Sequence, residues 1–107
     1  MSSCIFCDII KGISAARIIF EDNYLLAFYD VNPVAKIHAL VMPKKHIESL
    51  NNLLEKDYIL ITKINVAIPK IAKELQLHKG FKTIINTGKA GGQKIFHLHY
   101  HIIGSNE

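Results

Sequence analysis

The chain has 107 residues, enough for one domain with a single modest core. Half of its residues are apolar and about a fifth are charged, a composition that excludes a disordered chain. No apolar run approaches the roughly 18 residues that span a bilayer, and the N-terminus has no basic leader. We therefore expect a soluble cytoplasmic protein without a membrane partner.

The net charge of +4 does not by itself predict a nucleic-acid partner. The excess is nearly all lysine, with Arg17 the only arginine, and the lysines are scattered rather than gathered in a basic arm. A positive field would still favour small anions such as nucleotides.

The first half of the chain predicts a short helix followed by three strands. Residues 7–12 form the helix, which ends at Gly12 because glycine readily takes the left-handed conformation. The β-branched and aromatic runs at 17–22 and 24–30 predict a hairpin. After a turn at Pro33, residues 37–43 predict a third strand, whose alternation separates His38, Leu40 and Met42 from Ile37, Ala39 and Val41.

The second half predicts one long helix and two more strands. From about Leu54 to Leu77 the apolar residues are three or four apart, as in an amphipathic helix: Ile61, Ile64, Ile68, Ile71 and Leu75. Pro69 should kink this helix. Strands are expected at 81–86 and 94–103, with a glycine-rich loop at 87–93 between them. This order predicts an α+β protein with an antiparallel sheet covered on one face by the helix.

Three histidines alternate along the last predicted strand, so His97, His99 and His101 should line one face. Three imidazoles in a core would each need a hydrogen-bond partner, which makes a purely structural role the weaker interpretation. One functional alternative is a catalytic zinc site, with His38 as a ligand from another strand. The other is an imidazole nucleophile that attacks phosphorus, with its neighbours fixing its tautomer and binding phosphate.

The loop before the histidines favours the second alternative. The sequence "GKAGGQ" offers flexible backbone N–H groups that can approach an anion, together with a glutamine amide. A zinc site would need no such loop, whereas a phosphate-transfer site would use both halves of this segment.

Cys4 and Cys7 form a C-x-x-C sequence at the start of the chain. In an intracellular protein this spacing indicates a redox pair, half of a metal site, or two unrelated thiols. A thioredoxin-like pair would follow a strand in a βαβ unit, so the position of this pair weakens the redox interpretation.

These motifs together resemble the histidine triad (HIT) superfamily, whose signature is H-x-H-x-H followed by apolar residues. The sequence "HLHYHII" matches that signature, and the Hint-like branch is similar in order and spacing over almost the whole chain. The matching segments are "IFCDIIKG", "RIIFEDNYLLAFYDVNP", "HALVMPKKHI", "IINTG" and "GGQKIFHLHYH".

The resemblance implies a fold and an activity. A single HIT domain over residues 1–107 would have a five-stranded antiparallel sheet, one long helix and a short N-terminal helix, with a ten-stranded sheet across a homodimer. It would bind purine nucleotides of the AMP or GMP type and hydrolyse nucleoside phosphoramidates or related adenylated compounds, without an organic cofactor. A dinucleoside polyphosphate hydrolase of the fragile-histidine-triad type and a nucleotide-binding regulator with little turnover remain alternatives.

The resemblance also implies residue roles. His99 would attack the α-phosphorus, the carbonyl of His97 would accept its Nδ1–H, His101 would contact the phosphate, and His38 would support the cluster. The substrate-binding residues implied are Asp30 for ribose, Asn86, Gly92 and Gln93 for phosphate oxygens, and Phe6, Ile9, Phe28 and Val31 for the base. Without the resemblance, the last four would be interpreted as core positions.

Many bacterial members of the superfamily carry a structural zinc, and the resemblance assigns its ligands here to Cys4, Cys7, His46 and His97. The alternative is two buried thiols and a histidine at a helix start. His78 is interpreted as a surface residue. Lys94 departs from the family pattern, because close animal relatives have a serine that helps to hold the phosphate. A lysine binds an anion as a point charge but does not reproduce a hydroxyl, so the leaving-group preference does not carry over.

Overall fold

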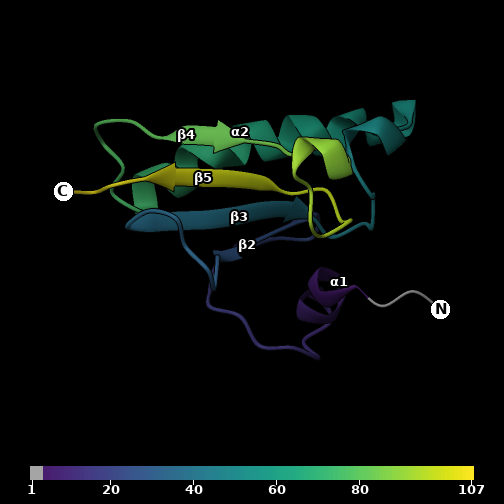
Figure 1. Ribbon diagram of the computed structural model, residues 1–107, viewed down its shortest axis with the longest axis horizontal. Helices are drawn as coiled ribbons and strands as arrows, with labels where there is room; N and C mark the ends of the chain where they lie inside the picture. Colours follow the sequence, from purple (N-terminus) through teal and green to yellow (C-terminus); the bar gives the residue numbers. More distant parts are fainter. Residues whose placement is uncertain (1–3) are drawn as a thin grey trace.

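The computed structural model describes residues 4–107, which fold into a five-stranded antiparallel sheet with a long and a short helix (Figure 1). The strand order is β1-β2-β3-β5-β4, and every neighbouring pair is antiparallel. The elements in chain order are α1 (Ile5–Ile10), β1 (Ile18–Glu21), β2 (Leu25–Tyr29), β3 (Ile37–Pro43), α2 (Tyr58–Glu74), β4 (Lys82–Ile84) and β5 (Tyr100–Gly104). This is the α+β architecture predicted for one subunit; the ten-stranded sheet of a dimer stays a prediction.

The two faces of the sheet carry two separate hydrophobic clusters, as the alternation of β3 predicts. Ala39 and Val41 belong to the cluster beneath α2, which also contains the buried helix residues Ile64, Ile68, Ile71 and Leu75. Leu40 and Met42 belong to the smaller cluster that includes Phe6 of α1. In Figure 1, α2 and α1 accordingly lie on opposite sides of the sheet.

The long helix begins later than predicted, at Tyr58 rather than near Leu54. Residues Glu55–Asp57 form a short 3-10 turn in which the Asp57 carboxylate accepts the Leu54 N–H at 3.0 Å. The same carboxylate pairs with Lys45 at 2.5 Å. The hydrogen bond from Lys45, followed by that from the Leu54 N–H, lowers the pKa of Asp57. The hydrogen bond to Leu54 closes the 3-10 turn, and the α-helix begins at the next residue.

The prediction of one continuous strand over 94–103 is wrong. The strand β5 begins at Tyr100, and residues 94–99 form a bend and extended backbone. The short partner β4 ends at Ile84, opposite His101, so there is no strand beside the earlier residues on that side. Instead, the Leu98 N–H donates to the carbonyl of Ile47 at 2.7 Å, outside the sheet. His97 and His99 therefore lie outside the strand and only His101 lies on it, although Leu98, Tyr100 and Ile102 still pack together on the α2 side.

The exposure of His78 and the character of the helices can be compared with the sequence predictions. His78 is exposed, as predicted. Between residues 4 and 107, no helix combines the length and apolar character required to cross a membrane.

Candidate functional site

A cavity of about 560 Å³ opens on the sheet face that carries α1. Its lining contains eleven of the residues that the resemblance assigns to catalysis or substrate binding, together with Lys94, the lysine expected to bind an anion: His38, His99, His101, Asp30, Asn86, Gly92, Gln93, Phe6, Ile9, Phe28, Val31 and Lys94. They come from α1, β2, β3, β5 and the glycine-rich loop, so segments far apart in sequence meet here. The exception is His97, whose side chain does not line the cavity.

The ring of His99 is held in one orientation and one tautomer. Its Nδ1 lies 2.6 Å from the carbonyl oxygen of His97, and because a carbonyl only accepts, Nδ1 carries the hydrogen. The lone pair of neutral His99 is therefore on Nε2. Burial lowers the pKa of His99 below its usual value, which keeps the ring neutral and the lone pair available. Phe6 packs edge-on against the ring at 5.0 Å between centroids.

His38 and His101 form a second ordered pair. The Val34 N–H donates to Nδ1 of His38 at 3.2 Å, so Nε2 of neutral His38 carries the hydrogen. That Nε2 lies 2.8 Å from Nδ1 of His101, which must accept, and the hydrogen of His101 is consequently on its Nε2. Burial, followed by the nearby His99 and His38, lowers the pKa of His101 to about 4. His101 is thus a neutral N–H donor at neutral pH.

Asp30 lies beside this pair at the end of β2. One carboxylate oxygen accepts the Asn32 N–H at 2.8 Å, and the other lies 3.4 Å from Nε2 of His38. Asp30, His38 and His101 are close enough together to suggest a metal site. The Val34 hydrogen bond argues against one, because it leaves Nε2 of neutral His38 without a lone pair.

The glycine-rich loop is more self-contained than the sequence predicts. Gly88 and Gly92 have φ of 74° and 85°, values that favour glycine, and residues Lys89–Gly91 form a 3-10 turn. Within this turn the N–H groups of Gly91 and Gln93 donate to Gly88, and that of Gly92 donates to Lys89. These three N–H groups are thus hydrogen-bonded within the turn, and the expected binding of an anion by the loop backbone stays a prediction.

The Gln93 amide is also committed within the protein. It is buried, its oxygen accepts the Gly88 N–H at 2.9 Å, and its nitrogen donates to the carbonyls of Glu48 at 2.7 Å and Ile95 at 3.0 Å. Both amide hydrogens are thereby used, so the expected donation from this side chain to a phosphate has no free N–H in this arrangement. Gln93 instead fixes the loop, as does Asn86, which donates to the Gly91 carbonyl at 2.8 Å.

An apolar wall faces the histidines. Phe6 and Phe28 are both buried, and their rings meet edge-on at 5.5 Å between centroids. They belong to the smaller hydrophobic cluster, the α1 cluster, and also line the cavity. The same two side chains therefore pack the core and form the wall of the pocket. Ile9 is half-buried beside them. Val31 is 85% exposed, which is incompatible with the core position that its residue type alone suggested.

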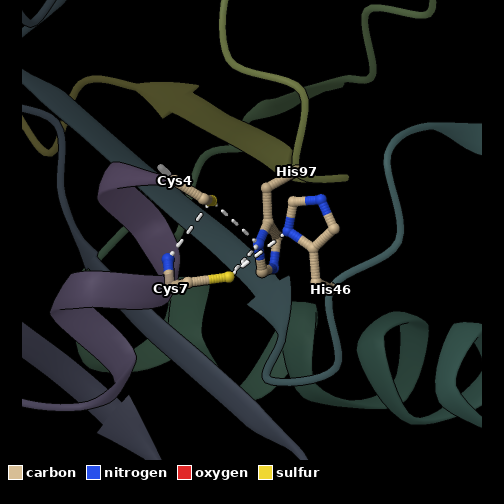
Figure 2. A group of neighbouring side chains, drawn as sticks. All are labelled: Cys4, Cys7, His46 and His97. Carbon is tan, nitrogen blue, oxygen red and sulfur yellow. Dashed lines mark hydrogen bonds between the residues drawn. The ribbon is translucent and has the colours of Figure 1, made fainter. Parts of the chain in front are cut away.

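The four residues expected to hold zinc converge between α1 and the bend before β5 (Figure 2). Nδ1 of His97 lies 3.5 Å from the Cys4 sulfur and 3.6 Å from the Cys7 sulfur, and Nδ1 of His46 lies 3.3 Å from the Cys7 sulfur. Tetrahedral zinc with its usual bond lengths separates a sulfur and a nitrogen ligand by about 3.6 Å. The donor set and its spacing therefore fit a structural zinc ion.

The chemistry of the four side chains fits a metal as well as their spacing does. Nε2 of His97 lies 2.8 Å from the Pro43 carbonyl and must donate to it, which leaves the lone pair on Nδ1, facing the sulfurs. Burial lowers the pKa of His97 to about 4, so this lone pair is free at neutral pH. Burial, followed by the neighbouring Cys4, raises the pKa of Cys7, so the Cys7 thiol does not ionise readily unless a cation lies beside it.

The comparisons with known proteins were decisive for the family. The family model described as "HIT domain" matches residues 11–107. The chain belongs to the HIT family. This HIT protein is 45% identical to protein HitA of Neisseria gonorrhoeae, with 98% of each chain covered. Among solved structures, it matches a histidine triad protein from Clostridium difficile at 44% identity and a TM-score of 0.92, covering 100% of this chain and 96% of that one. It also matches a HIT family hydrolase from Legionella pneumophila at 36% identity and a TM-score of 0.93, covering 98% and 95%.

Several residues of the HIT cavity had no signal in the sequence. Val34 is the most informative, since its backbone N–H sets the tautomer of His38 although its side chain is 74% exposed. A backbone donor carries no residue-type signature, so only the structure reveals it. The other lining residues not foreseen are Ile5, Ala15, Ala16, Asn32, Leu40 and Ile95.

Proposed function

We propose that this HIT protein, acting as a single domain over residues 1–107, is a nucleotide hydrolase and transferase. Its substrates would be purine nucleoside phosphoramidates or related adenylated compounds, cleaved to the nucleoside monophosphate through a nucleotidyl-His99 intermediate. The observation that carries the proposal is the 2.6 Å hydrogen bond from His99 Nδ1–H to the His97 carbonyl, which leaves the lone pair of the neutral ring on Nε2 in a residue that lines the cavity.

In the first step, the lone pair of His99 Nε2 would attack the α-phosphorus. The bond between phosphorus and the leaving nitrogen breaks, its electron pair stays on that nitrogen, and the released amine takes up a proton from solvent. In the second step, a water oxygen attacks phosphorus, the bond between phosphorus and Nε2 breaks, and the water proton returns to solvent. His99 is regenerated and the nucleoside monophosphate leaves.

The other pocket residues would bind and orient the substrate. His101 donates from Nε2 and so supplies a hydrogen bond to a phosphoryl oxygen, which gains charge density in the transition state. Asp30 has a carboxylate oxygen near the cavity that can accept a ribose hydroxyl. The apolar wall of Phe6 and Phe28 suits the flat face of a purine.

Zinc held by Cys4, Cys7, His46 and His97 would supply a structural cross-link and no Lewis-acid step. His97 is the residue that joins the metal site to the chemistry, because its ring faces the sulfurs while its carbonyl orients His99. The cross-link would tie α1, which carries Phe6, to the segment that carries the nucleophile.

We also propose the homodimer. The strand β4 is an edge of the sheet, and α2 exposes apolar residues on one of its faces: Tyr58, Ile59 and Val66, with exposed fractions of 61%, 61% and 55%. An edge strand and an apolar helix face together favour association with a second copy. Light scattering of wild type and Val66→Glu tests this: we expect a dimer that the substitution weakens, whereas a wild-type monomer would contradict it.

The activity is tested by incubating wild type and His99→Asn with adenosine 5′-phosphoramidate and following AMP release. The proposal predicts turnover by wild type and a loss of at least a thousandfold in the variant, with AMP binding retained. An inactive wild type that still binds AMP would support the alternative of a nucleotide-binding regulator. Cleavage of diadenosine polyphosphates much faster than of the phosphoramidate would support the polyphosphate hydrolase.

A further inference from the structure

Among residues 4–107, Lys94 is the only lysine or arginine that lines the cavity. The remaining ionisable groups of the lining are the carboxylate of Asp30 and three histidines. The side chain is exposed, and among residues 4–107 its Nζ has no hydrogen-bond or ion-pair partner. This ammonium group is therefore unneutralised and free to meet an anion that enters the pocket.

The backbone of Lys94 is fixed although its side chain is not. The side chain of Gln93, the residue before the lysine, donates to the carbonyl of Ile95, the residue after it, at 3.0 Å and to that of Glu48 at 2.7 Å. These two hydrogen bonds hold the backbone on both sides of Lys94 in place. Ile95 is half-buried against the α1 cluster. The long side chain of Lys94 thus starts from a defined point at the cavity, and its own rotamers determine only how far it reaches.

The strand order indicates which part of a substrate Lys94 would meet. Phe28 and Asp30 reach the cavity from β2 and its end, whereas the loop that carries Lys94 follows β4, the far edge of the sheet. His38 and His101 lie between them on β3 and β5. A nucleotide with its base and ribose towards β2 and its phosphorus at His99 would direct its leaving group towards the loop.

We propose that Lys94 makes this protein select substrates whose leaving group carries a negative charge close to the scissile bond. This inference rests on the proposed function and adds a substrate class to it. The leaving group would bear a carboxylate or a phosphate-like group, since a compact ammonium attracts either as a point charge. A leaving group without a negative charge would make no ion pair with the Lys94 ammonium.

The test compares three adenosine 5′-phosphoramidates of similar size, N-linked to glycinamide, glycine and aminomethylphosphonate. Wild type should have a kcat/KM for the glycine adduct about tenfold above that for the neutral glycinamide adduct. The aminomethylphosphonate arm shows whether a phosphate-like group is preferred over a carboxylate. Because Lys94 is exposed, the preference should weaken as ionic strength rises from 0.02 M to 0.5 M.

Two variants isolate the lysine and one serves as a control. Lys94→Gln should bring the ratio of the glycine to the glycinamide adduct close to one, and Lys94→Arg should retain most of the preference. Lys89→Gln removes a positive charge from the same loop outside the cavity lining and should leave the ratio unchanged.

The possible failures are distinguishable. If wild type cleaves none of the adducts, the proposed function fails. If wild type cleaves the charged and neutral adducts equally, or if Lys94→Gln lowers both to the same extent, the leaving-group role is overturned while the hydrolase stands. An equal loss would mean that Lys94 binds the phosphate common to all substrates.

Discussion

The backbone carbonyl of His97 and Nδ1 of His99 are joined by a hydrogen bond of 2.6 Å, and the same His97 places its ring beside two cysteine sulfurs. One residue therefore serves the candidate metal site through its side chain and the candidate nucleophile through its backbone. A ligand that holds the ring also restricts the carbonyl, so metal loading and the orientation of His99 should be linked.

The first prediction concerns this link. His97→Ala removes a ligand but keeps the carbonyl, and we expect zinc content, measured by elemental analysis, to fall well below one equivalent and phosphoramidase activity to fall at least tenfold. His97→Cys offers sulfur in place of nitrogen, and zinc accepts three cysteines and one histidine. This variant should retain about one equivalent and more activity than the alanine variant. Equal activity in both variants, whatever their zinc content, would disconnect the metal site from His99.

The second prediction concerns the loop clamp at Gln93. Gln93→Glu replaces a donor by a carboxylate that faces the carbonyls of Glu48 and Ile95, so hydrogen bonds become repulsions. Stability measured by urea unfolding should fall by about 1–3 kcal/mol, the usual cost of leaving a buried polar group unsatisfied. The value of kcat/KM should fall about tenfold as the loop loosens. Gln76→Glu, at an exposed position just after α2, is the control: it should leave kcat/KM unchanged and lower stability by less than about 1 kcal/mol, the usual cost of a negative charge at a helix C-terminus. A stable and fully active Gln93→Glu would show that the clamp is dispensable.

The third prediction concerns the aromatic wall. Phe6→Ala removes a buried ring that contacts Phe28 and His99, so both folding and nucleotide binding should suffer. We expect the free energy of unfolding to be about 3–5 kcal/mol lower than in wild type, and the Kd for AMP, measured by calorimetry, to rise roughly tenfold. The matched control is Phe96→Ala, since the Phe96 side chain is 45% exposed. Comparable losses in the two variants would contradict the role given to α1.

The fourth prediction concerns acid sensitivity through His101, whose pKa falls from an ordinary 6.5 to about 4 because of burial. Between these values the unfolded chain binds a proton that the folded chain does not, so stability falls as pH falls through this range. Denaturant unfolding of wild type and His101→Asn at pH 7 and pH 5 should show wild type losing about 1 kcal/mol more, a figure that allows for the partial exposure of the ring. Parallel losses would mean that the pKa of His101 is not lowered. The proposed reaction needs His101 in its neutral form, which a pKa of about 4 preserves at neutral pH. Titration of His101 should therefore cause no change in kcat/KM between pH 6 and pH 8.

Much of the fold could be predicted from the sequence because it follows from side-chain periodicity. The alternation in β3 separates His38, Leu40 and Met42 from Ala39 and Val41, and the structure distributes these residues in this way. The helix stripe from Ile64 to Leu75 likewise depends only on a period of 3.6 residues. Each pattern lies within a single element, whose own period decides which of its residues face which hydrophobic cluster.

The parts that failed depend on partners that a local pattern does not contain. The last strand starts at Tyr100, opposite Val41 of β3, and just before it the Leu98 N–H donates to the carbonyl of Ile47 outside the sheet. This distant backbone partner cannot be recognised from the segment itself. The amide of Gln93 donates to the backbone of Glu48, 45 residues away, a partner that the local sequence does not reveal; its contact with a phosphate stays a prediction. The His97 carbonyl that orients His99 was anticipated from the family resemblance, whereas the Val34 N–H that orients His38 has no such signal.

The central claim is that His99 becomes covalently attached to the nucleotide. Its most direct test is to mix enzyme with excess radiolabelled adenosine 5′-phosphoramidate, quench within milliseconds into denaturant at alkaline pH, where phosphohistidine-type bonds persist, and map the labelled peptide by mass spectrometry. The account predicts an adenylyl group on His99 that forms and decays at rates consistent with turnover, and none in His99→Asn. Label on another residue, or steady turnover with no labelled protein at any quench time, would contradict it.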